Sequence, residues 1–170
     1  MLRLQRIAPD NAHVYRTVRL RALATDPTAF GSTYEREAQL SDEDWRQRAL
    51  RCSGAGSTGY LAFDGVAPCG LIACFMNEQH PNCADVISMW VDPTYRRAGV
   101  GTALINAVES WAESAGLVEL RLMVTSVNSG ATRFYERLGF CMTGKTEPYP
   151  NDPVIVEYEM ALPLAPHAGP

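Results

Sequence analysis

The chain has 170 residues, 46% of them hydrophobic and 20% charged, a composition typical of one globular domain with its own core. Fifteen basic and nineteen acidic residues leave a formal charge of -4, which argues against a general nucleic-acid binder. No apolar run approaches the roughly 20 residues of a membrane helix, and the N-terminus lacks the apolar block of a secretory signal. We expect one cytoplasmic domain over residues 1–162 and a disordered tail at 163–170.

The cysteines and histidines are scattered and show no metal-ligand spacing. The five cysteines stand at positions 52, 69, 74, 83 and 141, with no C-x-x-C pair among them. An odd count without such spacing argues against a disulfide framework and against a tetrahedral zinc site. We therefore expect free thiols in a reducing compartment and no metal.

Hydrophobic periodicity predicts the elements in chain order. Strands are expected at 2–7, 60–63, 70–76, 85–91, 119–124, 140–144 and 154–162, and helices at about 14–23, 45–50, 102–115 and 128–138. A Pro-rich loop is expected at 147–153. Hairpins followed by strand–helix–strand units predict a mixed α/β sheet.

The loop Arg96–Gly101 lies between a predicted strand and a predicted helix. Gly99 and Gly101 allow the backbone to approach a ligand closely, and the unpaired N–H groups of the next helix face the same point. With two arginines beside them, these groups form a diphosphate site.

The loop admits three other interpretations. A P-loop nucleotide site is excluded because Gly-Lys-Ser/Thr is absent. A Rossmann dinucleotide site stays open, because Gly99 and Gly101 match its first two glycines and Glu119 falls near the position of a ribose carboxylate, although Leu104 replaces the third glycine. A strand-to-helix turn with solvated arginines also explains the residues.

A second motif follows in residues 128–140. Asn128, Ala131 and Tyr135 lie on one stripe of the predicted helix. Each of the key residues also has a structural explanation, since Asn128 suits an N-cap, Gly139 suits a helix end and Tyr135 suits a core position.

The two segments WVDPTYRRAGVGTALI and NSGATRFYERLGF together resemble the GNAT superfamily of N-acetyltransferases. The element order agrees over nearly the whole chain, and the resemblance departs at Arg97, where the family often has glycine. It implies an α/β fold with a mixed, mostly antiparallel sheet of about seven strands, splayed at the acetyl-CoA site and flanked by about four helices.

The resemblance also implies an activity and site residues. The chain would be an acyltransferase that moves acetyl from acetyl-CoA, its co-substrate, to a primary amine by direct attack in a ternary complex. Backbone groups of Trp90 and Val91 would hold the pantetheine and polarise the thioester carbonyl. The pyrophosphate would be lined by Arg96, Arg97, Ala98, Gly99, Gly101 and Thr102. Asn128 would contact the pantetheine, and the Tyr135 hydroxyl would protonate the leaving thiolate.

Direct transfer also requires a general base. Asp85 is the first choice, because the family often has an acidic residue at a similar strand position. Glu78 and Glu35 are the alternatives, and a solvated surface role is open for each of the three.

The acceptor stays open. Acidic residues around the first two helices permit a cationic amine such as a polyamine, an aminoglycoside or a lysine side chain, whereas Arg19 and Arg21 could receive a substrate carboxylate. We expect a small-molecule or peptide amine as partner, with no nucleic acid and no membrane. The last strand and the loop before it offer a surface for a homodimer. A non-catalytic acyl-CoA-binding domain and an enzyme with a longer acyl donor are the functional alternatives.

Overall fold

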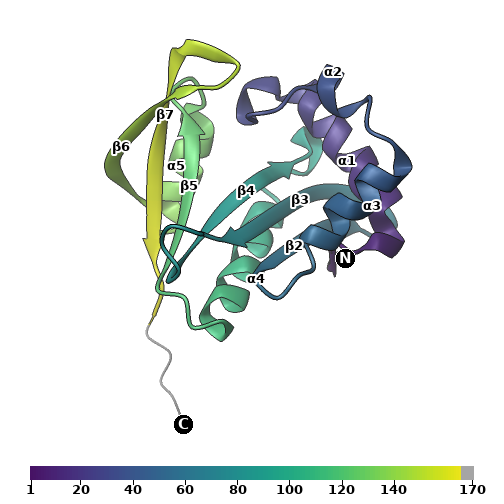
Figure 1. Ribbon diagram of the computed structural model, residues 1–170, viewed down its shortest axis with the longest axis horizontal. Helices are drawn as coiled ribbons and strands as arrows, with labels where there is room; N and C mark the ends of the chain where they lie inside the picture. The colour runs from purple at the N-terminus through teal and green to yellow at the C-terminus, as the bar shows by residue number, and fades with distance from the viewer. Residues whose placement is uncertain (166–170) are drawn as a thin grey trace.

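A seven-stranded sheet organises the computed structural model, which describes residues 1–165 (Figure 1). The strands are β1 (Leu2–Arg6), β2 (Ser57–Asp64), β3 (Ala67–Met76), β4 (Cys83–Val91), β5 (Glu119–Thr125), β6 (Cys141–Tyr149) and β7 (Asp152–Pro163). Their order across the sheet is β1-β2-β3-β4-β5-β7-β6. All neighbours pair antiparallel except β4 and β5, which are parallel. The predicted mixed, mostly antiparallel sheet is confirmed.

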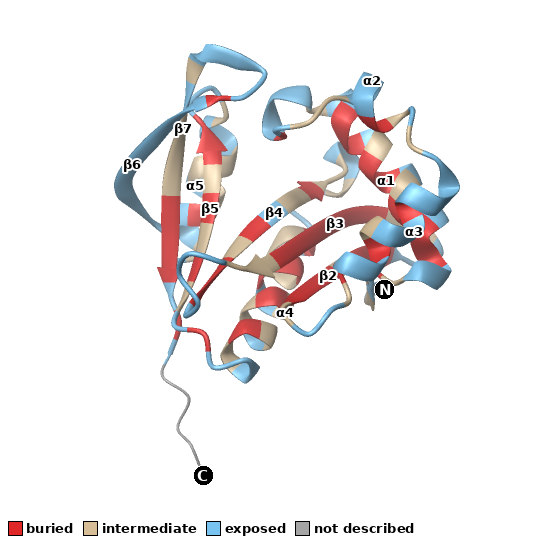
Figure 2. Ribbon diagram, viewed as in Figure 1, coloured by how far each residue is buried: buried red, intermediate tan, exposed pale blue. Residues whose placement is uncertain are grey.

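Helices cover both faces of this sheet. They are α1 (Ala12–Thr25), α2 (Tyr34–Glu37), α3 (Asp42–Arg51), α4 (Val100–Ser114) and α5 (Ser129–Arg137), with 3-10 turns at Pro9–Asn11, Pro27–Ala29 and Pro93–Tyr95. On one face α1 and α3 bury Leu23 and Trp45 against Leu71. On the other face α4 buries Leu104 against Leu120. The middle of β3 is buried throughout (Figure 2). The buried residues of the central strands belong to two hydrophobic clusters, one on each face of the sheet.

The sheet divides between β4 and β5. The two strands pair only where Cys83–Asp85 meets Glu119–Arg121, and beyond this point they diverge (Figure 1). An irregularity in the β3–β4 register coincides with Ser88, whose φ of 57° is unusual for a residue with a side chain. Because a bulge bends and twists its strand, this position turns the end of β4 away from β5. The backbone of β4 beyond Asp85 thus has no strand partner on the β5 side.

Two elements differ from the sequence expectations. The Pro-rich loop predicted at 147–153 is wrong, because β6 continues to Tyr149 and β7 begins at Asp152. Pro148 is compatible with β6 because β6 is an edge strand, where a missing N–H is tolerated. The four-residue helix α2 was not predicted, since one helical turn carries no periodic pattern.

The C-terminal boundary also differs. Pro163 still belongs to β7, and Leu164 is buried, with its N–H donating to the carbonyl of Val118 at 2.8 Å. The rest of the predicted tail, residues 166–170, lies outside the described residues. Within residues 1–165 every helix is too short or too polar to cross a bilayer.

Candidate active site

A cavity of about 830 Å³ lies where β4 and β5 separate. We call it the loop cavity, because the loop between β4 and α4 forms one wall and α5 forms another. Of the residues expected to bind acetyl-CoA, the cavity wall includes Trp90, Val91, Arg96, Arg97, Gly99, Gly101, Thr102 and Asn128. Ala98 is exposed and does not line it. The structure therefore brings two motifs that are separate in sequence to one cavity.

The glycines of the loop have distinct structural roles. Gly99 is the N-cap of α4 with φ of 81°, a left-handed conformation that favours glycine. It offers no side-chain cap, so the first N–H groups of α4 are left without that partner. At Gly101 an added Cβ would lie 2.9 Å from Cζ of Phe134, so this glycine allows α4 to approach α5. The helix N-terminus that the sequence predicted is thus present and uncapped.

The arginines around the loop cavity divide into two groups. Arg96 is held by Asp26, with which it forms an ion pair, and by the carbonyl of Val91, to which its Nε donates at 3.0 Å. Arg97 lines the cavity and has no hydrogen-bond or ion-pair partner among residues 1–165. Arg133 and Arg137 of α5, which sequence reasoning missed, line it in the same unpaired way. Their i, i+4 spacing was the available signal.

Arg97, where the family often has glycine, has a backbone conformation that suits glycine. Its φ is 66°, in the left-handed region where glycine is at ease and L side chains are strained. The backbone therefore keeps the conformation that glycine suits, while the chain carries a guanidinium there.

Asn128 lies at the N-terminal end of α5, and Tyr135 lies near its C-terminal end. Asn128 caps α5, since its Oδ1 accepts from the N–H of Ala131 at 3.1 Å. Tyr135 is 8% exposed, with its ring edge-on to Phe134 and Phe140 at centroid distances of 5.2 and 5.5 Å. Its hydroxyl has no hydrogen-bond partner in the described part of the chain. Burial raises the pKa of the Tyr135 phenol, so it stays protonated at neutral pH and can donate a proton.

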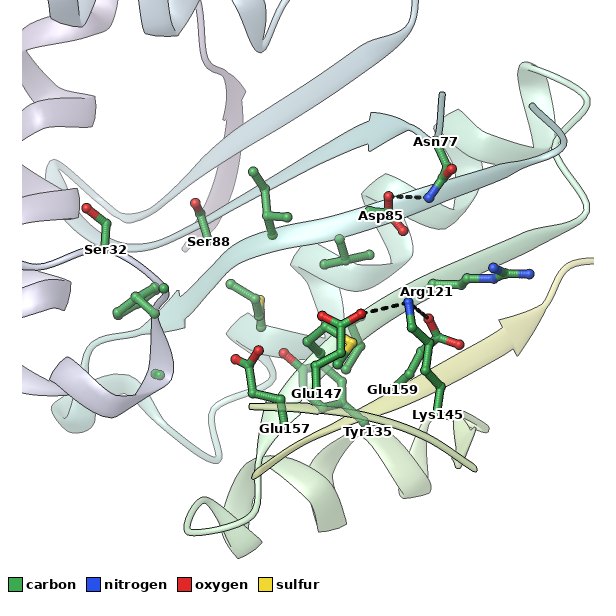
Figure 3. Close-up of a pocket in the computed structure, with 18 of the residues that line it drawn as sticks. Ser32, Asn77, Asp85, Ser88, Arg121, Tyr135, Lys145, Glu147, Glu157 and Glu159 are labelled. Carbon is green, nitrogen blue, oxygen red and sulfur yellow. Dashed lines mark hydrogen bonds and ion pairs between the residues drawn. The ribbon is translucent and has the colours of Figure 1, made fainter. Parts of the chain in front are cut away.

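A second cavity, of about 500 Å³, adjoins the first. We call it the hairpin cavity, because the β6–β7 hairpin supplies Glu147, Glu157 and Glu159 to one wall, while β4 supplies Asp85 and Ser88 to the opposite wall (Figure 3). Ala29, Met89 and Tyr135 line both cavities. The two cavities therefore meet at the Tyr135 ring.

The three candidate bases occupy different places. Asp85 lines the hairpin cavity and accepts a hydrogen bond from Nδ2 of Asn77 at 2.8 Å. Glu78 and Glu35 are exposed and line neither cavity. Glu157, which also lines the hairpin cavity, was not singled out from the sequence, because a charged residue that alternates with apolar ones along a strand gives no sign of a cavity.

The expectation that Arg19 could receive a substrate carboxylate is not supported. Arg19 is only 7% exposed and is bound by both carboxylate oxygens of Glu37, at 3.0 and 2.8 Å. It also contacts Oγ of Ser88 at 3.2 Å. Arg21 lies outside both cavities and pairs with Asp92 at 3.5 Å. The Arg19 guanidinium is thus already satisfied and braces the irregular part of β4.

No set of three His, Cys, Asp or Glu residues within 1–165 is arranged to hold a metal ion. All five cysteines fall within this range, carry free thiols and line neither cavity.

Comparisons with known proteins agree with this geometry. The model of the Acetyltransferase (GNAT) family matches residues 18–140. An uncharacterized N-acetyltransferase of Methanocaldococcus jannaschii is 39% identical over 77 residues, which is 43% of this chain and 34% of that protein. The chain thus spans about a third of the length of this relative.

Solved structures extend the likeness to the whole fold. A GNAT-family acetyltransferase from Streptococcus pneumoniae superposes with a TM-score of 0.80 at 20% identity, covering 97% of this chain and 100% of that one. A putative streptothricin acetyltransferase from Bacillus anthracis, in complex with acetyl coenzyme A, gives a TM-score of 0.59 at 25% identity over 66% of this chain and 65% of that one. The expected fold class is confirmed.

Proposed function

Because the chain belongs to the acetyltransferase (GNAT) family, we propose that it transfers an acetyl group from acetyl-CoA to a primary amine of a small molecule or peptide. One observation carries the proposal. A cavity suited to a diphosphate meets a cavity lined by carboxylates, and the largely buried side chain of Tyr135 lines both.

The loop cavity fits the chemistry of coenzyme A. Uncapped N–H groups at the start of α4 and the unpaired guanidiniums of Arg97, Arg133 and Arg137 would bind its phosphates. The β4 backbone near Trp90 and Val91, which has no β5 partner, would hold the pantetheine and polarise the thioester carbonyl. The acetyl-CoA bound to the Bacillus anthracis relative supports the same assignment.

The chain's residues then account for each proton of a direct transfer. The amine nitrogen forms a bond to the acetyl carbon, and the carbon–sulfur bond breaks. Asp85, directly or through water, would take one proton of the incoming ammonium, and Tyr135 would give its proton to the departing sulfur. The second proton, which the nitrogen loses as the amide forms, would return to Tyr135 through solvent. Because no cysteine lines either cavity, the described residues offer no thiol to carry the acetyl group, which favours direct attack.

Calorimetric titration of acetyl-CoA tests the proposal first. We expect micromolar-range binding, with NADH and ATP as controls that do not bind, followed by thiol release when an amine library is added. Absence of acetyl-CoA binding would contradict the proposal. Binding without thiol release from any amine would instead favour a non-catalytic acyl-CoA-binding domain.

Replacement of Asp85 by Asn tests the proposed base. The amide keeps the shape of the carboxylate beside Asn77 but cannot take a proton, so we expect kcat/KM to fall about 10²-fold and the pH–rate profile to change. An unchanged rate and profile would remove Asp85 from the mechanism.

Two further expectations stay proposals. A cytoplasmic location is proposed because all five cysteines are free thiols. A homodimer is proposed because β6 is an exposed edge strand, and sedimentation analysis would test it.

A further inference from the structure

The hairpin cavity is the place where an acceptor would meet the acetyl group, if the function proposed above holds. It shares Ala29, Met89 and Tyr135 with the loop cavity, so a ligand in it reaches the same hydroxyl as a ligand in the loop cavity. A cavity of about 500 Å³ falls in the range of small-molecule sites.

The charges lining this cavity do not cancel. Its carboxylates are Asp85, Glu147, Glu157 and Glu159. Lys145 partly neutralises two of them, since its Nζ lies 2.9 Å from Glu147 and 3.8 Å from Glu159. The other permanently cationic residues of the wall are committed elsewhere, because Arg19 pairs with Glu37 and Arg121 with Glu119. Asp85 and Glu157 are left without a cationic partner among residues 1–165.

Glu157 occupies the least favourable position of the four. It lies directly opposite Glu147 in the β6–β7 register, and like charges that face each other across strands destabilise a sheet. Burial and the neighbouring Glu147 charge raise the pKa of the Glu157 carboxyl. A positive charge bound between the two carboxylates would remove this repulsion.

Tyr135 gives a second, independent indication that a polar ligand belongs here. Its side chain is 8% exposed, its hydroxyl has no partner within residues 1–165, and it lines this cavity together with Glu157 and Glu147 (Figure 3). A hydroxyl that opens into a cavity and has no protein partner is free to hydrogen-bond a polar ligand bound there.

We infer that the acceptor is a small amine carrying a second positive charge, and that Glu157, with Glu147, binds a cationic group of it. The cation is organic, because the described residues form no three-ligand metal group. The reacting nitrogen then lies on the Tyr135 side, where the two cavities meet. Glu157 is thus a specificity-determining residue, distinct from the proposed base.

Matched acceptors test the inference. Acetyl transfer is measured with 1,4-diaminobutane and spermidine, and with 1-aminobutane, which keeps the reacting amine but lacks the second charge. We expect kcat/KM for the diamine and triamine to exceed that for the monoamine at least about tenfold. In Glu157→Gln we expect this preference to fall about tenfold, mainly through a higher KM for the diamine and the triamine.

Controls separate this inference from the proposed function. Glu43→Gln, on the exposed face of α3, serves as the matched control and should keep the wild-type preference. Calorimetry should show spermidine binding to the CoA-bound protein and weaker binding to CoA-bound Glu157→Gln. Equal use of monoamine and diamine, or a better acceptor among uncharged-side-chain peptides, with acetyl-CoA binding intact, would overturn the inference and leave the proposed function standing. Failure to bind acetyl-CoA would instead remove the proposed function on which it rests.

Discussion

The loop cavity and the hairpin cavity meet at one tyrosine but are built in different ways. The loop cavity depends on backbone: an uncapped helix N-terminus, a left-handed glycine and an unpaired strand edge, joined by arginines from α5. The hairpin cavity depends on side chains from β4, β5, β6 and β7, brought together by long-range pairing. A site made by backbone is visible in short motifs, whereas a site made by side chains depends on the completed fold.

Tyr135→Phe should have the largest effect, because both cavities use this residue. The ring contacts with Phe134 and Phe140 are kept, so the fold and acetyl-CoA affinity should hardly change. Loss of the proton donor should lower kcat about 10²-fold or more. Steady-state kinetics measures the loss of kcat, and calorimetric titration of acetyl-CoA checks that the affinity is kept.

Tyr149→Phe is the matched control for that variant. The Tyr149 hydroxyl is also buried, but it donates to the carbonyl of Phe30 at 2.6 Å and lines neither cavity. Its loss should lower the free energy of unfolding by about 1 kcal/mol and leave kcat unchanged. A full-rate Tyr135→Phe enzyme would show that the thiolate leaves without this acid.

Glu37→Ala should remove the ion pair that holds Arg19 against Ser88 in the wall of the hairpin cavity. Glu37 is 1% exposed and binds both Arg19 and Arg48, so its removal leaves the buried Arg19 charge unpaired. We expect the free energy of unfolding to fall by about 3–5 kcal/mol in urea titration. Glu43→Ala, which breaks an exposed pair with Arg46, should change it hardly at all. Similar losses in the two variants would contradict the buried role.

The same residue predicts a pH dependence of stability. Burial opposes ionisation of Glu37, but the hydrogen bond and charge of Arg19, together with the charge of Arg48, hold its pKa below the usual range. A carboxyl with a lowered folded-state pKa stabilises fully above its unfolded pKa of about 4.3, and this contribution is lost as pH falls through the folded pKa. Glu37→Gln should therefore show a shallower loss of stability on acidification below about pH 4.3 than the wild type. If the stability of the variant and of the wild type depended on pH in the same way, ionisation of Glu37 would not contribute to the acid dependence of stability.

Arg97→Gly should give the smallest effect and tests the backbone side. Glycine relieves the left-handed strain at this position, so this variant should be about 1 kcal/mol more stable than Arg97→Ala, which keeps the strain. Both variants lose the guanidinium, and both should raise KM for acetyl-CoA a few-fold, more at low salt than at high salt. Equal stability of the two would mean that Arg97 is not strained.

Sequence reasoning succeeded where local chemistry determines structure. The strand, the Gly99–Gly101 turn and the start of α4 follow from adjacent residues, and so does the α5 stripe that ends at Gly139. It failed where a residue's meaning depends on a distant partner. Glu157 is an ordinary solvated strand residue until β6 places Glu147 opposite it and β4 diverges to leave space beside it.

The predictions for Arg19 and for the loop that contains Pro148 were wrong for the same reason. Arg19 looks like a free helix-surface cation until α2 brings Glu37 against it. Pro148 signals a loop unless the strand that carries it is known to be the sheet edge. Whether a charged side chain is buried, and whether a strand lies at the edge of the sheet, both depend on the complete fold.

The distribution of the thiols has a practical consequence. Cys52, Cys69, Cys74 and Cys83 are buried, and burial raises the pKa of each, whereas Cys141 is exposed on β6. A disulfide reagent that detects liberated CoA should therefore meet one reactive protein thiol per folded chain, and Cys141→Ser should give a colourless baseline. The same asymmetry lets a single fluorophore be attached at Cys141, on β6 but outside both cavities, so that the chain carries one label that does not occupy either cavity.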